Sequence, residues 1–332
     1  MAIVMSKIYW SGLHAKLHKT LRQRSLLPPQ EKVLVAVSGG QDSLCLGKLL
    51  LDLRSKWHWE IAIAHCDHQW STDEGIAERV SEVADTWQLP FYLKIADILA
   101  ETEAAARSWR YQALIEIARS QGFKYIVTGH TKSDRAETFL YNLVRGAGAD
   151  GLAALNWQRP LTDNITLVRP ILNVYRRETL EFCHQFDLPI WFDAVNRNNK
   201  YARNRIRNEL IPYLQDNFNP QVEGSLAQTA ELLKADVEYL EATAKEVLVR
   251  ATIDSYKLNR LVLKDTPLAI QRRAIRQFLQ TVISRQPTFA QIEAVVNLIG
   301  APNRSRTSTL PGGAIAEVAG QWIIFHLNIE HG

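Results

Sequence analysis

The stretch Ser38-Gly39-Gly40-Gln41-Asp42-Ser43 decides the fold of the first half of this chain. An apolar run at 33–37 precedes it, and a helix-like run at 44–53 follows it. A strand, a glycine turn and a helix start thus succeed one another, and a helix start offers unpaired backbone N–H groups and the positive end of the helix dipole. Two glycines let a phosphate chain approach the backbone closely. The pattern predicts a phosphate-binding turn, with Asp42 as a carboxylate able to hold a metal ion.

The spacing of the glycines distinguishes this turn from a Walker loop, which has four residues between its glycines and then Lys-Ser/Thr. Six residues separate Gly40 from Gly47, and Leu49 follows Lys48. An ordinary tight turn is the alternative, but every residue of the turn is small or compatible with phosphate. The pattern Ser-Gly-Gly-x-Asp-Ser resembles the pyrophosphate loop of the N-type ATP pyrophosphatases. This resemblance implies that the whole turn, 38–43, binds ATP.

The length suits two domains or one domain with a large appendage, and the composition indicates a reducing compartment. The chain has 332 residues, 46% of them hydrophobic, which is enough for a core without disulfides. Its three cysteines are scattered, with no Cys-x-x-Cys pair. We expect no membrane span, because no apolar run reaches about 18 residues, and no signal peptide, because charged residues interrupt the N-terminal segment. These features predict a cytoplasmic protein.

Basic character is concentrated in two short segments, although the net charge is only +4. Residues 1–30 hold five Lys or Arg and no acid, and residues 194–215 hold five Lys or Arg and one acid. Such segments suit a polyanion such as RNA. Solvated basic faces are the alternative explanation, and charge alone does not decide between the two.

Short apolar runs alternate with helical patterns through the first domain, which we place at 1–215. Strands are expected at 32–37, 60–65, 90–95 and 124–128, and helices at 12–27, 42–54, 73–88, 103–121, 134–145 and 175–186. This alternation predicts a doubly wound, mostly parallel α/β sheet, in which ligands bind beyond the carboxyl ends of the strands near the topological switch point. A smaller, mainly helical C-terminal domain is expected at 216–332. Its helices are expected at 225–250, 267–284 and 287–299, before a terminal hairpin at 314–327.

Two polar clusters follow predicted strands and are expected to converge on the turn. His65-Cys66-Asp67-His68 follows the second strand, where adjacent side chains diverge too much for a metal site. We interpret it as nucleotide recognition, with His65 in the ATP site, against the alternative of an ordinary polar loop. Thr128-Gly129-His130 follows the fourth strand, and Gly129 is assigned to the same site.

Asp134 and Glu137 lie three residues apart at the start of the next helix, and therefore share a face. Two adjacent carboxylates repel unless a cation joins them, and Mg²⁺ held by carboxylates and ATP phosphates is a natural occupant. If Asp134 and Glu137 are considered without the turn at 38–43, the simpler explanation is that they are solvated acids favoured by the helix dipole. Beside the turn, we interpret Asp42, Asp134 and Glu137 as catalytic residues and as ligands of Mg²⁺.

Arginines form the remaining candidate set. Arg107 and Arg110 share a helix face and are predicted to bind phosphate or a base, or to lie in a surface ion-paired face. Arg203, Asn204, Arg205 and Arg207 form the second basic segment and are predicted to contact RNA. A Gly-x-Gly-x-x-Gly match at 146–151 follows a helix rather than a strand, so a dinucleotide site is not predicted there.

Taken together and in this order, the motifs resemble those of the tRNA(Ile)-lysidine synthetases. They are Ser38–Ser43, His65–His68, Ala106–Tyr111, Gly129-His130 with Asp134 and Glu137-Thr138, 145–152, Arg169-Pro170, and Asp193–Asn196 with Arg203–Arg207. The resemblance covers about residues 30–215. It implies an adenine nucleotide alpha hydrolase-like domain followed by an accessory tRNA-binding domain.

The resemblance also implies the reaction. The O2 atom of the wobble cytidine of a CAU-anticodon tRNA(Ile) attacks the α-phosphate of ATP, and the ε-amine of L-lysine then displaces AMP to give lysidine. Members of the family allow a homodimer. The chain departs from the family pattern at Ser133, where a first acid is usual, and at Gln69-Trp70, where an arginine often stands.

Three other classes share parts of this pattern. A tRNA 2-thiolation enzyme would need cysteine pairs or clusters, which are missing from the sequence. A small-molecule amide synthetase would not explain the basic segments, and the chain has no glutaminase-like half. A nucleotide sensor without catalysis would need fewer acids than Asp42, Asp134 and Glu137. The lysidine-forming reaction is therefore the preferred hypothesis.

Overall fold

The computed structural model describes residues 10–70, 73–97, 102–153, 155–191, 201–283 and 285–326. Two compact units make up the chain, one ending at Leu232 and the other beginning at Leu233. The boundary expected after residue 215 precedes helix α10 (Val222–Ala251), whereas the two units divide within this helix. Among the described helices, none is long and apolar enough to cross a membrane.

The first unit contains a six-stranded sheet with the strand order β3-β2-β1-β4-β6-β5. Its strands are β1 (Lys32–Ala36), β2 (Glu60–Asp67), β3 (Phe91–Ile95), β4 (Tyr125–Thr128), β5 (Gln158–Thr162) and β6 (Ile165–Val168). Neighbouring strands run parallel except β5, which pairs antiparallel with β6. The predicted mostly parallel sheet is confirmed.

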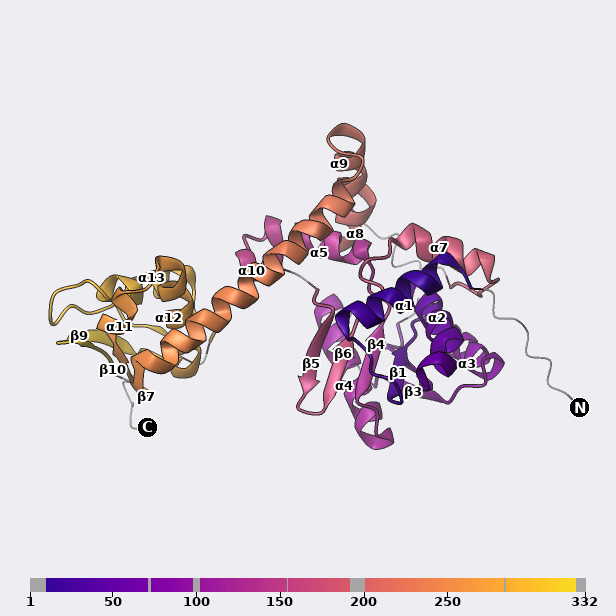
Figure 1. The fold of residues 1–332 in the computed structure, drawn as a ribbon, viewed down its shortest axis with the longest axis horizontal. Coiled ribbons are helices and arrows are strands. Elements are labelled where there is room, and N and C mark those ends of the chain that lie inside the picture. The colour runs from indigo at the N-terminus through magenta and orange to yellow at the C-terminus, as the bar shows by residue number, and fades with distance from the viewer. Residues whose placement is uncertain are drawn as a thin grey trace, which may run out of the picture. The chain divides into compact units, whose positions relative to one another are not determined.

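Helices cover both faces of this sheet (Figure 1). The helical segments of this unit before α10 are α1 (Gly12–Arg24), α2 (Gln41–Trp57), α3 (Ile76–Thr86), α4 (Glu103–Gln121), α5 (Lys132–Val144), α6 (Ala149–Leu152), α7 (Arg176–Gln185), α8 (Ala202–Arg205), the π-helical turn η2 (Ile206–Leu210) and α9 (Ile211–Asn217). Successive strand residues point to opposite faces, so Val33 and Val35 belong to the buried cluster that contains residues of α1, α2, α3 and α7. Leu34 belongs to the cluster around α4. Burial of both faces makes β1 apolar throughout, and this is why the sequence shows it so clearly.

The edge strand β5 and its neighbour β6 were not predicted from the sequence. Pro160 lies within β5, where it leaves a ladder position without an N–H donor, and the pairing shifts register between Pro160 and Thr162. β6 is only four residues long. An edge strand tolerates a proline and needs little apolar character, so its sequence does not stand out.

The second unit combines helices with a small antiparallel sheet. After α10 its elements are β7 (Thr252–Asp254), β8 (Lys257–Asn259), α11 (Arg260–Lys264), α12 (Leu268–Val282), α13 (Phe289–Leu298), the 3₁₀ turn η3 (Pro311–Gly313), β9 (Ile315–Ala319) and β10 (Trp322–His326). The predicted hairpin is β9–β10, and β8 and β7 extend it to a four-stranded sheet. Leu258, Phe278 and Ile323 are among the buried residues of its own core.

The strand order fixes where a ligand binds in the first unit. From β1 the chain proceeds outward to β2 and β3, then returns to place β4 on the other side of β1. The switch point therefore lies between β1 and β4, and the crevice beyond the carboxyl ends of these strands is the expected ligand site.

Candidate active site

The glycine turn joins β1 to α2 at the switch point. The Ser38 N–H donates to the Ser43 hydroxyl (3.1 Å), which in turn donates to the Gly40 carbonyl (2.9 Å). Gly39 has a φ of 80°, in the left-handed region that favours glycine. Gly40 is the N-cap of α2 and supplies no capping side chain. The turn thus holds a helix start whose backbone N–H groups are available to an anion.

A cavity of about 280 Å³ lies beside this turn. Of the residues predicted to bind ATP, Ser38, Asp42, Ser43, His65 and Gly129 line it. These side chains come from the ends of β1, β2 and β4, or from the turns that follow, as expected for a parallel sheet. The structure therefore brings together the clusters that the sequence placed after separate strands.

Gly39, Gly40 and Gln41 are not among the described residues that line the cavity. Gln41 instead donates to the Arg176 carbonyl (2.7 Å) and to the Thr179 hydroxyl (3.1 Å), which attaches α2 to α7. Their assignment to ATP binding stays a prediction. For Gly39 and Gly40, the predicted contact with ATP would be made by the backbone N–H groups. The Gln41 side chain instead joins α2 to α7.

Two of the three histidines that line the cavity, His65 and His130, are held in neutral forms. His65 is buried and its Nδ1 donates to the Val37 carbonyl (2.7 Å), so that Nε2 is left as an acceptor. Burial lowers the pKa of His65. Burial also lowers the pKa of His130 to about 3, although Asp134 acts against this. Neither ring adds positive charge to the cavity at neutral pH.

Positive charge in the cavity comes from arginines instead. Arg107 and Arg110 on α4 both line it, as their shared helix face predicted, and so does Arg176 on α7. Arg110 lies 3.3 Å from the Nε2 atom of His68, whose Nδ1 faces Asp73 at 3.4 Å. The first three residues of the predicted cluster form the end of β2, and its last residue, His68, positions Arg110, so that three guanidinium groups face a space suited to a triphosphate.

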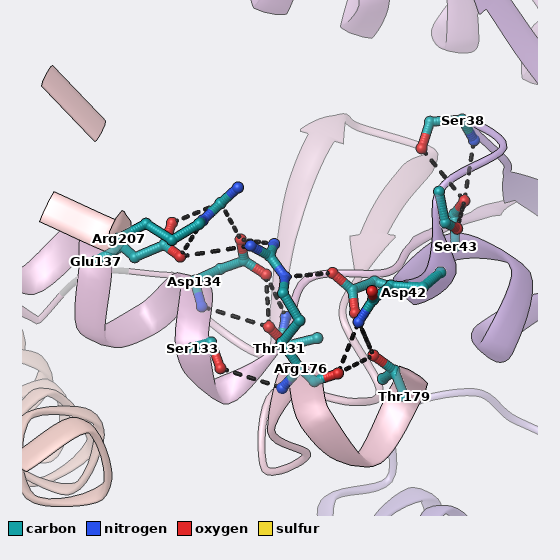
Figure 2. Close-up of polar contacts among 12 residues, drawn as sticks. Ser38, Asp42, Ser43, Thr131, Ser133, Asp134, Glu137, Arg176, Thr179 and Arg207 are labelled. Atoms are coloured by element: carbon teal, nitrogen blue, oxygen red, sulfur yellow. Dashed lines mark hydrogen bonds and ion pairs between the residues drawn. The ribbon is translucent and has the colours of Figure 1, made fainter. Parts of the chain in front are cut away.

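Arg176 joins all three predicted acids (Figure 2). Its Nε donates to Asp42 Oδ2 (3.0 Å) and its Nη2 to Asp134 Oδ1 (3.2 Å), while Nη1 lies 3.6 Å from Glu137 Oε1. The sequence predicted that a cation must join these carboxylates. The described residues supply that cation themselves.

The second basic segment also turns toward these acids. Arg207 donates through Nε and Nη2 to the two oxygens of Glu137 (2.7 and 2.8 Å), and Arg203 donates to the Thr138 hydroxyl (2.9 Å). Asn204 is buried, and Arg205 lines a separate apolar pocket. RNA contacts by these residues stay a prediction. Asp193–Asn196, which the sequence assigned to the same motif, lie outside the described residues.

The three acids do not fit a site in which they alone hold Mg²⁺. Asp42 accepts from Arg176 and Thr179, and the second oxygen of Asp134 accepts from the N–H and hydroxyl of Thr131 (both 2.7 Å). With the contacts of Glu137, every oxygen of the three carboxylates has a donor. Within the described part of the chain, no group of three or more His, Cys, Asp or Glu side chains could hold a metal ion.

Asp42 and Asp134 differ in their tendency to bind a proton. Burial raises the pKa of Asp42, and the neighbouring Asp134 adds to this, while Arg176 and Thr179 act in the opposite direction. Burial also acts to raise the pKa of Asp134, but Arg176, His130 and Arg203 outweigh it and lower that pKa well below its usual range. The pair therefore holds its first proton on Asp42.

The sequence interpretation missed Arg176 and Thr179, which arrange the acids. One signal was present, because Arg176 opens a helix, where the dipole disfavours a cation. Ser133, which replaces the family's first acid, has its own carboxylate partner: its hydroxyl donates to Glu223 in the first turn of α10 and accepts from the Arg176 N–H (3.1 Å).

Gly129 lies against the phosphate-binding turn so closely that a methyl group does not fit. A Cβ atom there would lie 2.8 Å from the backbone carbonyl of Asp42 and 2.9 Å from the Ser43 nitrogen. We expect Gly129→Ala to displace the turn, to lower the free energy of unfolding by about 1–3 kcal/mol and to reduce ATP affinity by at least about tenfold. Thermal unfolding and titration with ATP measure both effects.

Gly148→Ala is the matched control, because nothing lies within 4 Å of a Cβ atom there. We expect its stability to stay within about 0.5 kcal/mol of that of the parent protein. Unchanged ATP affinity in Gly129→Ala would show that the switch-point crevice is not where ATP binds.

Comparison with known proteins agrees with this geometry. Residues 11–214 match the family model of the PP-loop domain, and residues 258–320 match that of the TilS substrate binding domain. Proteins named tRNA(Ile)-lysidine synthase from Nostoc sp. and Synechocystis sp. are 57% and 52% identical to this chain, each match covering 95% of the chain and 97% of the relative. The chain belongs to the tRNA(Ile)-lysidine synthase family.

A more distant relative belongs to the same family, and a solved structure has a similar fold. A chloroplastic tRNA(Ile)-lysidine synthase from Zygnema circumcarinatum is 36% identical, over 84% of this chain and 78% of that protein. The U34-tRNA thiolase NcsA from Methanococcus maripaludis has a similar structure, with a TM-score of 0.57 at 17% identity, over 67% of this chain and 77% of that one. At this identity the likeness shows a shared fold alone. The family membership confirms the resemblance that the ordered motifs indicated.

Proposed function

We propose that this chain is an ATP-dependent ligase that joins L-lysine to C2 of the wobble cytidine of a CAU-anticodon tRNA(Ile), releasing AMP and pyrophosphate. Its product, lysidine, changes decoding from AUG to AUA. The observation that carries the proposal is the convergence of the turn at 38–43, Asp42 and Asp134 on one cavity at the switch point. Family membership supports the choice of acceptor.

In the first step, the cytidine O2 attacks the α-phosphorus and the bond to the β-phosphate oxygen breaks. The turn and the start of α2 receive the pyrophosphate, whose charge Arg107, Arg110 and Arg176 offset. In the second step, the ε-amine of lysine forms a bond to C2 and AMP leaves with the former O2 atom. The ammonium group must lose a proton before its lone pair can attack C2, and we assign the acceptance of that proton to Asp42, because its pKa is the higher of the two acids.

A second cavity, of about 340 Å³, suits the acceptor nucleotide. Arg107 lines both this cavity and the first, while Thr138, Tyr141, Asn142 and Arg203 line the second but not the first. No carboxylate is among the described residues that line it, which disfavours the lysine ammonium as its occupant. An aromatic ring, an amide and guanidinium groups are the usual partners of an unstacked base and its phosphate.

Three finer features belong to the same proposal. Mg²⁺ accompanies the phosphates of ATP, where it would neutralise the leaving pyrophosphate. The reaction takes place in the cytoplasm, consistent with free thiols at all three cysteines. The matched TilS substrate binding domain, within the second unit, contributes to tRNA binding, and a homodimer is one assembly that the family allows.

The decisive experiment supplies ATP, Mg²⁺, labelled lysine and tRNA(Ile) with a CAU anticodon. We expect label to enter the RNA in step with pyrophosphate release. The same tRNA with a UAU anticodon is the control and should accept none. ATP cleavage without lysine in the RNA would show that the acceptor or the amine has been assigned wrongly.

A further inference from the structure

Glu137 is the most enclosed of the three acids, with 1% of its surface exposed. It is not among the described residues that line the ATP cavity, whereas Asp42 and Asp134 are. Arg207 forms a two-pronged contact with its oxygens, and the Nε of Arg203 lies 3.5 Å from Oε2. Glu137 therefore faces Arg207 and Arg176 (Figure 2) and is not part of the lining of the ATP cavity among the described residues.

We propose that Glu137 is a positioning residue that holds Arg176, Arg203 and Arg207 in place, and that it is not a ligand of Mg²⁺. The assay of lysine incorporation into RNA rests on the proposed function. The measurement of Mg²⁺-dependent ATP binding requires only that the chain binds ATP. It replaces the sequence interpretation, in which Glu137 completed a three-carboxylate metal site.

Charge and coordination both favour this role. Three guanidinium groups balance three carboxylates in this cluster. Mg²⁺ needs oxygen ligands at about 2.1 Å in near-octahedral geometry, so it would have to displace the arginines from oxygens that already accept hydrogen bonds. An added dication would also repel the guanidinium groups that remained.

The local helix geometry explains how the arginines reach Glu137. Arg203 on α8 and Arg207 on η2 are four residues apart in one continuous helical segment, which places them on one face. Arg207 lies in the π-helical turn, a widened turn that is frequent at functional sites. Both arginines therefore approach Glu137 on α5 from the same element.

Two of the three arginines connect Glu137 to the two cavities, although Glu137 itself is not among the described residues that line either one. Arg176 lines the ATP cavity, and Arg203 lines the second cavity. Displacing these guanidinium groups by about 1 Å is enough to cost roughly a hundredfold in rate. Glu137 thus aligns the cationic walls of the two sites, one for ATP and one for the acceptor.

The test compares Glu137→Gln, Arg207→Lys and the double variant. The first measurement is ATP affinity at a series of Mg²⁺ concentrations, which requires neither RNA nor lysine. The second is kcat/KM for lysine incorporation. Glu231→Gln is the matched control, because Glu231 also pairs with two arginines, Arg24 and Arg135, but lines neither cavity among the described residues.

We expect the Mg²⁺ concentration for half-maximal ATP binding to stay within about twofold of the parent value in all variants. Each single variant should lose about a hundredfold in kcat/KM, and the double variant no more than about threefold further, because both changes break the same contact. The control should stay within about twofold. Should Glu137→Gln fail to fold, Arg207→Lys alone must still show the loss.

Any of three results would overturn the proposal. One is an increase of tenfold or more in the Mg²⁺ requirement of Glu137→Gln, since a lost metal ligand weakens metal binding directly. The second is a normal kcat/KM in Arg207→Lys, and the third is losses that multiply in the double variant. A parent protein that binds ATP but transfers no lysine would refute the proposed function and leave the Mg²⁺ measurement to decide the role of Glu137.

Discussion

Replacing Asp42 with asparagine is expected to reduce lysine incorporation by a factor of about a thousand or more. Asp42 lines the ATP cavity, and its two oxygens accept from Arg176 and Thr179. Asparagine keeps the shape but cannot accept a proton from the lysine ammonium, and loss of an acid–base group typically costs about 10²–10⁴ in rate. Its neutral amide also attracts the Arg176 guanidinium less strongly than the carboxylate does, which loosens the cationic wall.

Single-turnover lysine transfer measures this effect, with ATP affinity measured in parallel. Asp52→Asn is the matched control, because Asp52 lies on the same helix and also pairs with a cation, Lys48 at 2.6 Å, but does not line the cavity. It should lose stability and keep its rate of transfer. Near-normal transfer by Asp42→Asn would remove Asp42 from the reaction.

The sequence predicted most of the sheet and the position of the site because their signals are local. The turn at 38–43 shows a strand, two glycines and a helix start within a few residues, and β1 is apolar throughout because both faces of the sheet are covered. The edge strand β5 has no such signal, since it is half-exposed and contains Pro160. Local pattern therefore reveals buried central strands better than edge strands.

Contacts within the site could not be predicted in the same way. Arg176 is 134 residues from Asp42 and 42 from Asp134, and Arg207 is 70 from Glu137. In the sequence, the segment 194–215 has five Lys or Arg and one acid, so its arginines look like an excess of positive charge. The fold pairs two of them with Glu137, and an acid so far along the chain cannot be assigned as a partner without the tertiary structure.

The missing acid at Ser133 illustrates the same limit. In the sequence it is a departure from the family pattern at one position. In the structure its hydroxyl lies between the Arg176 backbone and the Glu223 carboxylate. An acid from the first turn of α10 is thus brought beside the position where the pattern lacks one, and a comparison of aligned motifs cannot detect this substitution by a distant residue.

Replacing Arg176 with methionine is expected to lower the free energy of unfolding by roughly 3 kcal/mol at pH 7 and to abolish lysine transfer. The change leaves Asp42, Asp134 and the buried Glu137 without the guanidinium that joins them, and removing one partner from a buried ion pair typically costs about 3–5 kcal/mol. The lower figure applies because the Arg176 side chain is 29% exposed. Arg177→Met, at an exposed position next to it, should change stability by less than about 1 kcal/mol.

The difference between the parent and Arg176→Met should shrink as the pH falls. In the parent, burial acts to raise the pKa of Asp134, but Arg176 and its neighbours lower it below the unfolded value near 3.8. The ionised Asp134 therefore stabilises the fold fully above pH 3.8. This stabilisation is lost as the pH falls through the pKa of Asp134 in the folded protein. In the variant, Asp42 and Asp134 lose the hydrogen bonds from Arg176, and we expect burial to raise their pKa values, so that protonation relieves their repulsion at a higher pH. Urea unfolding at pH 7, 5 and 4 measures the trend, and a difference that stays constant across this range would show that Arg176 does not stabilise the fold through these carboxylates.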